Sequence, residues 1–384
     1  MNSLELLKKL VAFPTVSRDS NLRLIEFVQG YLADFGIQAR LIHNEDGTKA
    51  NLWATIGPTD TAGIVLSGHT DVVPVDNQPW SSDPFTATLS NDRLYGRGSC
   101  DMKGFLACVL AAVPGFTKAA LKRPVHLAFS YDEERGCLGA PDLIKSIGDH
   151  EQIPLGCIIG EPTQMQPMLG HKGKRGVRCR VHGAACHSAF APYGVNAIEY
   201  AAKLIDHLGS LQETLKAPEH RDERFDPPFS TLQVGLISGG NALNIVPAEC
   251  QFDWEVRSLP GLNDGDIEKA MRSFATEVLE KEMQQISSQA HIEFEMLQRY
   301  PGLGTSPHSP MAELIAEITG RSDFSTVAFG TEGGLFSNAG IPAVVCGPGN
   351  MEQGHKADEY IALSELDRCD QMLAELERWL CKDV

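Results

Sequence analysis

The sequence lacks the features that would mark a disulfide scaffold, a zinc finger or a membrane protein. None of its ten cysteines forms a C-x-x-C pair, and many stand among apolar neighbours, as Cys108 does. This pattern indicates buried free thiols in a reducing compartment. No apolar run reaches about 18 residues, the length that spans a bilayer, and no basic segment with a cleavage site opens the chain. We therefore expect a cytoplasmic protein that does not enter a membrane.

Basic residues are a minority. The 33 lysines and arginines face 50 aspartates and glutamates, which gives a formal charge of −17. Such a surface repels polyphosphates, so we expect no nucleic-acid partner. It could attract a cationic substrate or divalent metals, although acidic faces also simply keep a protein in solution. At 384 residues the chain is long for one domain and comfortable for two.

The first part of the chain alternates strand and helix patterns. Short apolar runs at residues 39–42, 52–56, 64–68, 125–130 and 156–160 predict strands. Amphipathic or apolar stretches at 4–11, at 24–35 and from Lys103 predict helices. This order predicts an α/β domain whose mainly parallel sheet is flanked by helices.

The middle of the chain changes character. It shows, in order, a strand at 175–182, a helix at 196–211, strands at 231–237 and 248–256, a helix at 267–283 and a strand at 291–296. The order β-α-β-β-α-β is ferredoxin-like. We therefore expect an inserted α+β domain at residues 175–298. The first domain, residues 1–174 and 299–384, would resume with a helix near Met311 and end with one at 364–379.

Acidic residues and histidines stand at successive predicted strand ends. They are His69 and Asp71, then Asp101, then Glu133 and Glu134, then Glu161, and finally His355. In open α/β sheets, ligands bind beyond the carboxyl ends of the strands, so these side chains would converge there. Imidazole and carboxylate groups suit zinc, manganese or cobalt. Two such ions need a bridging carboxylate, and a further carboxylate can take a proton from an activated water.

Each piece alone has a plain alternative. A His-x-Asp pair on a strand can be a satisfied polar pair, Asp132-Glu133-Glu134 can be a solvated turn, and Glu161 before Pro162 can end a strand. Their joint occurrence at successive strand ends is what favours the metal interpretation.

These residues stand in segments that resemble the M20 family of metallopeptidases and deacylases over almost the whole chain. The segments that carry the resemblance are 68–74 (GHTDVVP), 96–104 (GRGSCDMKG), 132–134 (DEE), 160–163 (GEPT) and 354–355 (GH). The resemblance implies a metal-binding α/β domain with an inserted lid or dimerisation domain, and hence a homodimer.

The resemblance also implies roles for these residues. His69, Asp101 and Glu161 would hold one metal, and Asp101, Glu134 and His355 the other, with Asp101 bridging. Asp71 would orient His69, and Glu133 would be the general base. We expect one or two zinc ions per subunit, with cobalt as a substitute.

The resemblance assigns roles to three further residues, which stand in the expected inserted domain. By resemblance, His187 would steady the oxyanion, often across a dimer, and Asn244 and Arg257 would contact the substrate. An arginine can grip an α-carboxylate with two hydrogen bonds. Their alternatives are a loop or capping histidine and a surface ion pair.

The remaining question is which acyl amino acid is the substrate. Residues 330–334 (GTEGG) and 344–349 (VVCGPG) resemble the acetylornithine deacetylases of the family, and Glu332 could pair with the cationic side chain of ornithine. Desuccinylases tend to have Ser-Asp-Gly-Arg nearby, and no arginine follows Glu332. The expected reaction is hydrolysis of N-acetyl-L-ornithine to L-ornithine and acetate.

Other functions stay open at this point. Within the family, the alternatives are a succinyl-diaminopimelate desuccinylase, a dipeptidase or another acyl-amino-acid hydrolase. A non-catalytic amino-acid-binding relative is remote, because all the expected ligands and the base are present. A nucleotide-binding oxidoreductase is disfavoured because Gly96-x-Gly98 does not extend to the full G-x-G-x-x-G fingerprint.

Overall fold

The computed structural model describes residues 1–148 and 152–383, which form two compact units. Unit 1 comprises the described residues of 1–170, Leu303–Val327 and the chain from Thr331 onward. Unit 2 comprises His171–Gly302 and Ala328–Gly330. The limits of unit 2 lie close to the expected limits of the inserted domain, 175 and 298. Residues 149–151 and 384, which the expected first domain includes, lie outside the described residues.

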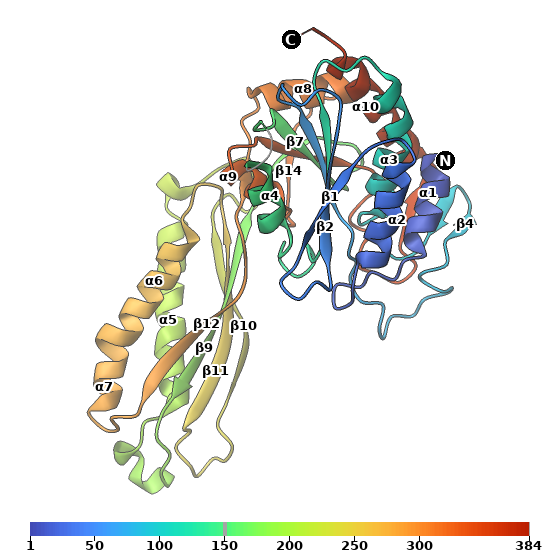
Figure 1. The fold of residues 1–384 in the computed structure, drawn as a ribbon. Helices are drawn as coiled ribbons and strands as arrows, with labels where there is room; N and C mark the ends of the chain where they lie inside the picture. Colours follow the sequence, from blue (N-terminus) through green and yellow to red (C-terminus); the bar gives the residue numbers. More distant parts are fainter. Residues whose placement is uncertain (149–151, 384) are drawn as a thin grey trace. The chain divides into compact units, whose positions relative to one another are not determined.

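Unit 1 is built on one large sheet (Figure 1). Its strand order is β1-β2-β6-β3-β7-β15-β8-β13, with β14 paired to β8. The four central strands, β6, β3, β7 and β15, run parallel, and antiparallel strands flank them. The expected mainly parallel sheet is therefore confirmed. The strands are β1 (Ala39–His43), β2 (Ala50–Ile56), β3 (Ile64–His69), β6 (Val125–Ser130), β7 (Gly156–Pro162), β8 (Met168–His171), β13 (Leu303–Gly304), β14 (Ser325–Val327) and β15 (Ala343–Gly347).

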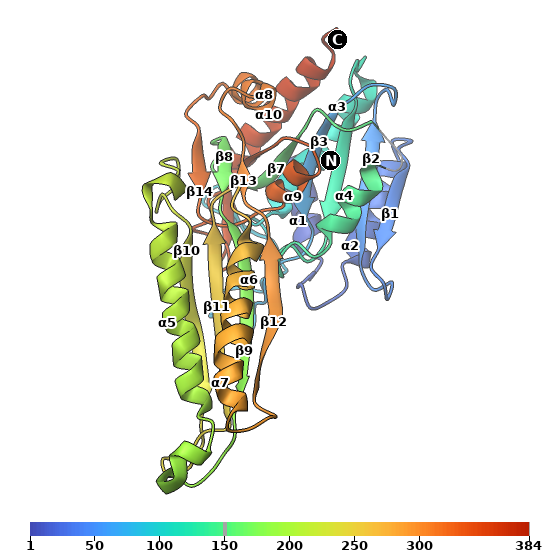
Figure 2. The same ribbon diagram turned by 90° about the vertical axis from the view of Figure 1, so that its left-hand side faces the viewer.

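Helices cover both faces of this sheet (Figure 2). One face packs against α1 (Ser3–Val11), α2 (Leu22–Ala33), α3 (Lys103–Lys118), α8 (Pro310–Thr319) and α10 (Leu363–Leu380). The other packs against α4 (Ala140–Gly148) and α9 (Gly333–Asn338). Adjacent residues of a strand point to opposite faces of the sheet. Leu66 packs into the core under α1, α2, α3, α8 and α10, and Val65 packs into the core under α4 and α9. This double burial explains why the central strands read as continuous apolar runs.

The central helix α3 directly follows the loop that holds Asp101, one of the expected metal ligands. Residues 105–110 of α3 are all buried, so the helix is enclosed on every side. A Cβ at Gly160 would lie 2.0 Å from the Phe105 ring. Glycine at this position therefore lets α3 approach β7 closely, next to Glu161. A small sheet in the order β16-β5-β4 joins β4 (Thr88–Ser90), β5 (Arg93–Tyr95) and β16 (Tyr360–Ala362).

Unit 2 is a four-stranded antiparallel sheet in the order β10-β11-β9-β12, with helices on one face (Figure 1). Its main elements are β9 (Gly173–His182), α5 (Ala197–Leu215), β10 (Thr231–Gly239), β11 (Glu249–Ser258), α6 (Asp264–Phe274), α7 (Glu280–Gln284) and β12 (His291–Tyr300). Short 3₁₀ segments lie at Ser188–Tyr193 and Pro218–His220. Both the element order and the strand order are those of the expected ferredoxin-like arrangement.

The sequence reading missed some local structure. The helix expected at 267–283 is α6 and α7 joined by a π-helical turn at Ala275–Leu279. Helices α4 and α9 and the small sheet were not identified from the sequence. Within residues 1–148 and 152–383, no helix combines the length and the apolar character that crossing a bilayer requires.

Candidate metal centre

The expected ligands lie at one edge of the sheet of unit 1. His69 is the last residue of β3, Glu133 and Glu134 follow β6, and Glu161 lies near the end of β7. Because β6, β3 and β7 are parallel neighbours, their carboxyl ends meet at the same edge. Asp101 comes just before α3, and His355 follows β15.

Asp101 lies between the two histidines. His69 Nε2 is 3.0 Å from Asp101 Oδ1, and His355 Nε2 is 3.0 Å from Asp101 Oδ2. On the first side, His69 Nε2 is also 3.6 Å from Glu161 Oε1. On the second side, His355 Nε2 is 3.1 Å from Glu134 Oε1. One carboxylate thus presents one oxygen to each of two imidazole–carboxylate pairs, which is the arrangement that a bridging ligand needs.

The ligand atoms are close enough to share ions. The donor atoms of His69, Asp101 and Glu134 all lie within 4.8 Å of one another, and so do those of His69, Glu133 and Glu161. Glu133 therefore lies in the same cluster as the residues expected to hold metal. The geometry alone leaves it free to act as a ligand or as a base.

The buried carboxyl groups of the cluster favour a bound cation. Burial raises the pKa of Glu133 and Glu161 well above the usual range, and nearby carboxylates add to the shift. Burial, followed by the charge of Asp101, raises the pKa of Glu134 to about 7. Several acids therefore compete in one buried place, and each disfavours the charge of the next. Divalent cations with imidazole and carboxylate ligands fit this donor set.

Histidine protonation balances the cluster when no ion is present. Hydrogen bonds to Asp101 and Glu134 raise the pKa of His355 to about 10. Burial alone would lower the pKa of His69, but its bonds to Asp101 and Asp71 outweigh burial and raise it. Burial would likewise raise the pKa of Asp101, but bonds from His355 and His69 lower it.

Asp71 connects a ligand to the expected base. The Nδ1 atom of His69 lies 2.9 Å from the backbone oxygen of Asp71 and 3.5 Å from its Oδ1. Because a carbonyl oxygen only accepts, Nδ1 donates and Nε2 is left to face Asp101. The Asp71 carboxylate also accepts from Ser17 Oγ at 2.6 Å and from the backbone N–H of Glu133 at 3.1 Å. Asp71 therefore fixes the positions of both His69 and Glu133.

Glu359 supports the bridging residue, and the sequence reading did not single it out. Its Oε1 accepts from the backbone N–H groups of Cys100 and Asp101 at 2.9 and 3.0 Å. Its Oε2 accepts from Arg97 Nη1 at 2.7 Å, and both side chains are buried. Both residues stand inside or beside the segments that carry the M20 resemblance, which was the available signal.

The same network reaches His355. Arg97 also bonds the side-chain oxygen of Gln78, whose Nε2 donates to the backbone oxygen of His355 at 3.0 Å. His355 has a φ of 63°, in the left-handed region that residues with a Cβ seldom adopt. Such backbone persists where its surroundings hold it, and Gln78 is one of the groups that do so.

Glu332 lies in unit 1 but is deeply buried. It is 1 % exposed, and its Oε2 accepts from Ser67 Oγ of β3 at 3.2 Å. Burial raises its pKa above the ordinary value. This position favours support of β3 over direct contact with a substrate cation, so its pairing with ornithine stays a prediction that the burial does not favour.

The other three expected residues belong to unit 2. His187 is exposed, and its Nδ1 accepts from the backbone N–H of Ala189 at 3.2 Å, so its neutral form carries the proton on Nε2. Asn244 is exposed, and its backbone oxygen accepts from Ser188 N–H. Arg257 Nε donates to Glu255 at 3.1 Å, and its Nη1 donates to the Tyr300 hydroxyl at 2.9 Å. The roles of all three at the metal centre stay predictions.

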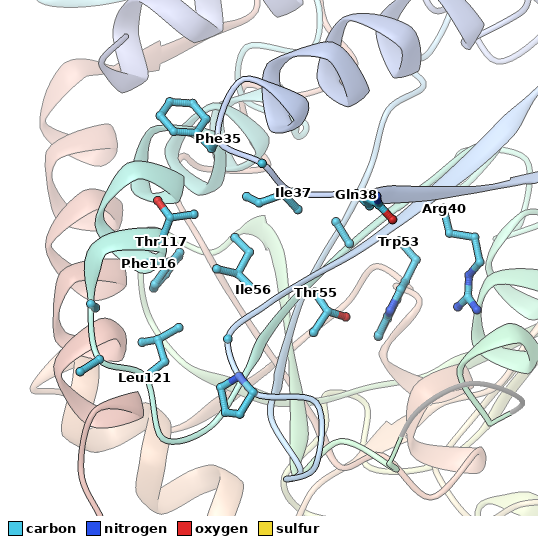
Figure 3. A pocket seen from close by; sticks show the side chains of 16 residues that line it. Phe35, Ile37, Gln38, Arg40, Trp53, Thr55, Ile56, Phe116, Thr117 and Leu121 are labelled. Atoms are coloured by element: carbon cyan, nitrogen blue, oxygen red, sulfur yellow. The ribbon is translucent and has the colours of Figure 1, made fainter.

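A hollow of about 920 Å³ elsewhere in unit 1 lacks comparable chemistry (Figure 3). It is lined by the loop before β1, by the end of β2 and by the end of α3, with Phe35, Trp53, Ile56 and Leu121 among its side chains. Ile56 pairs with Val125, the first residue of β6, so this hollow lies toward the opposite end of the strands from the metal centre. Arg40 is its one charged lining residue among those described.

The chain is similar to known proteins over most of its length. The chain matches Peptidase family M20/M25/M40 over residues 65–378. It is 34 % identical over 359 residues to an acetylornithine deacetylase of Aliivibrio salmonicida, covering 93 % of this chain and 91 % of that one. It is 33 % identical over 386 residues to an acetylornithine deacetylase of Pasteurella multocida, covering 98 % of both chains.

Solved structures share the fold. Aminopeptidase PepT of Bacillus cereus has a TM-score of 0.77 at 20 % identity, covering 99 % of this chain and 98 % of that one. The M20 family metallo-carboxypeptidase Sso-CP2 of Sulfolobus solfataricus has a TM-score of 0.75 at 20 % identity, covering 99 % of both chains. YXEP of Bacillus subtilis, a dinuclear metal-binding peptidase of the M20 family, has a TM-score of 0.66 at 14 % identity, covering 100 % and 98 %. The matched family segment and the full-length relatives show that the chain belongs to peptidase family M20/M25/M40 and is one of its amidohydrolases.

Proposed function

We propose that this amidohydrolase removes the acetyl group of N-acetyl-L-ornithine, giving L-ornithine and acetate, a step of arginine biosynthesis. The substrate is supported by the full-length similarity to relatives named acetylornithine deacetylase. The observation that carries the hydrolytic chemistry is the position of Asp101, with one carboxylate oxygen 3.0 Å from each of two histidines.

The residues present fit two zinc ions per subunit, with cobalt as a substitute. His69, Asp101 and Glu161 would hold one ion, and Asp101, Glu134 and His355 the other. When bound, such ions polarise an acyl carbonyl and make water a stronger nucleophile near neutral pH. Asp71 would keep His69 in the tautomer whose Nε2 is free to coordinate, because its backbone oxygen occupies Nδ1.

Glu133 would carry the proton. It stands beside the ligand Glu134, and the bond from its backbone N–H to Asp71 holds it in the cluster. It would take a proton from the attacking water and give it to the departing amine, as a general base and then a general acid. His187, whose neutral form has an Nε2–H donor, would stabilise the oxyanion. Arg257 and Asn244 would fix the amino-acid part of the substrate.

We also propose that the enzyme is a homodimer formed through unit 2. Among the described strands, β10 is an edge strand that pairs with β11 alone. Leu236 and Ile237 of β10 are 67 % and 56 % exposed, and an open apolar edge is a ready surface for strand pairing. Light scattering on wild type and on the Ile237→Asp variant would test this, and a monomeric wild type would contradict it.

We also propose that the enzyme functions in the cytoplasm. All ten cysteines are free thiols, which supports a reducing compartment.

A substrate panel tests the proposed reaction. Apoenzyme reconstituted with zinc or cobalt would be assayed on acetylornithine, acetylmethionine, succinyl-diaminopimelate and simple dipeptides. We expect the highest kcat/KM on acetylornithine. A preference for the succinyl substrate or for dipeptides would contradict the proposed substrate but not the proposed metal-dependent hydrolysis. Equal discrimination by Glu332→Gln and wild type would remove Glu332 from substrate selection.

A further inference from the structure

A second cluster of metal-ligating side chains lies in unit 2, apart from every residue assigned above. It joins His182, the last residue of β9, to His291 and Glu293 at the start of β12. Their donor atoms lie within 4.8 Å of one another. Glu249, the first residue of β11, completes the group with its carboxylate 2.9 Å from His182 Nδ1.

The strand register explains why these residues meet. His182 lies directly opposite Glu249 on one side and His291 on the other. Residues directly opposite on adjacent strands have their side chains on the same face, and Glu293 shares that face because it stands two positions after His291. The face is the one away from the apolar core of unit 2, which takes the neighbouring Val181 and Ile292.

Both imidazoles have their Nδ1 atoms occupied. His182 Nδ1 faces the carboxylate of Glu249, and His291 Nδ1 lies 2.8 Å from the backbone oxygen of Gln289. Both partners are acceptors, so each Nδ1 donates, and the neutral form of each ring presents the lone pair of its Nε2. An acceptor that orients an imidazole in this way is the usual outer partner of a metal-bound histidine.

The Nε2 atoms of both histidines lie near the carboxylate of Glu293, which when ionised can only accept hydrogen bonds. His182 Nε2 is 3.5 Å from Glu293 Oε2, and His291 Nε2 is 3.4 Å from Glu293 Oε1. His182 Nε2 is buried and has no hydrogen-bond partner among residues 1–148 and 152–383. In the same described residues no lysine or arginine pairs with Glu293; Arg180, which lies opposite Glu293 on β9, pairs with Glu295. Two imidazole nitrogens and a carboxylate therefore face one another.

The two rings stack with centroids 4.5 Å apart and an interplanar angle of 16°, so both imidazoles lie beside the Glu293 carboxylate. A divalent cation would satisfy all three acceptors at once. Ligand atoms around a tetrahedral zinc ion are about 3.3 Å apart, given bonds of roughly 2.0–2.1 Å. His182 Nε2 lies 3.5 Å from one oxygen of Glu293 and His291 Nε2 lies 3.4 Å from the other, and both separations are close to that value.

We propose that His182, His291 and Glu293 form a separate binding site for a transition-metal ion, zinc in the first place, with Glu249 orienting His182. The side chains of His182, His291 and Glu293 are 26 %, 48 % and 51 % exposed, so an ion can enter from solvent. Three protein ligands leave a position for water. The ion would link the end of β9 to the start of β12.

The zinc content of full-length variants tests the site. Wild type, His182→Ala, His291→Ala and a control, His220→Ala, would be equilibrated with zinc, desalted and analysed by mass spectrometry. His220 is an exposed histidine of the same unit, outside the cluster. We expect wild type and the control to carry one more zinc per chain than His182→Ala and His291→Ala, with hydrolytic activity retained in all four. Equal zinc in all four proteins would overturn the proposal.

Two further measurements separate metal from proton binding. Glu293→Gln keeps the shape of the side chain but removes a carboxylate ligand, and we expect it to lose the extra zinc. In NMR spectra, zinc should shift the imidazole signals of His182 and His291 at constant pH. If acid shifts these signals and zinc does not, the cluster binds protons only and the proposal fails. Neither result depends on the identity of the acyl substrate.

Discussion

The substitution Glu133→Gln separates the chemistry of the metal centre from its assembly. The bond from the backbone N–H of residue 133 to Asp71 Oδ1 does not involve the side chain and should survive. The amide is nearly the same size as the carboxylate and cannot accept the proton of the attacking water. The ligands His69, Asp101, Glu134, Glu161 and His355 are untouched.

The expected loss follows from the role. Proton transfer by a positioned side chain contributes about 10²–10⁴ in rate, equivalent to about 2.7–5.4 kcal/mol at about 1.36 kcal/mol per factor of ten. We therefore expect kcat on acetylornithine to fall by at least about 10², with zinc content per chain and the thermal unfolding midpoint unchanged. The assay combines steady-state kinetics with metal analysis on the same preparation.

Glu134→Gln is the matched control, because it changes the adjacent carboxyl group. Glu134 Oε1 lies 3.1 Å from His355 Nε2, so this variant should lose zinc together with activity. Wild-type kcat in Glu133→Gln would refute the base assignment. Loss of zinc in Glu133→Gln would instead make Glu133 a ligand, which the grouping of His69, Glu133 and Glu161 also allows.

Four further predictions test other parts of the account. A chelator should abolish hydrolysis and added zinc should restore it, whereas activity that persists in metal-free enzyme would contradict the site. Glu359→Gln should lower zinc affinity by about 10–100-fold in a competition titration, because it weakens the hold on Asp101; unchanged affinity would contradict this. Burial lowers the pKa of His171 to about 4, so the unfolded chain takes up a proton below about pH 6.5 that the folded chain does not. Stability should then fall by up to about 3 kcal/mol from pH 6.5 to 4, and less in His171→Asn, as measured by urea unfolding; equal pH slopes would refute it. Phe252→Ala should cost unit 2 about 3–5 kcal/mol in the same assay, because Phe252 is fully buried in its core; a loss under about 1 kcal/mol would contradict that.

The sequence predicted much of the fold because its periodicity is strong. Parallel strands buried on both faces read as apolar runs, and the alternation from Arg175 to His182 corresponds to β9. The strand-end positions of His69, Glu134 and Glu161 could be predicted for the same reason, since parallel strands bring their carboxyl ends together. The π-helical turn between α6 and α7 could not be predicted, because such a turn hardly changes the spacing of apolar residues.

The support around the ligands depends on contacts between distant parts of the chain. Glu359 bonds the backbone of Asp101 across 258 positions, and no local pattern announces such a pairing. Glu332 was expected at the substrate because its segment resembles the deacetylases and it is acidic, and its hydrogen bond to Ser67 of β3 joins positions 265 residues apart. The His182 and His291 pair arises from strand register, which the hydrophobic pattern fixes only once both strands are paired.

The central claim is that Asp101 joins two metal sites in one centre. Anomalous diffraction at the zinc edge, from crystals grown with zinc, measures this directly. We predict two strong peaks in unit 1, about 3.5–4 Å apart, one beside His69 and Glu161 and the other beside Glu134 and His355, with an Asp101 oxygen on each. A single peak away from Asp101, or ligands too far apart to share ions, would contradict the account.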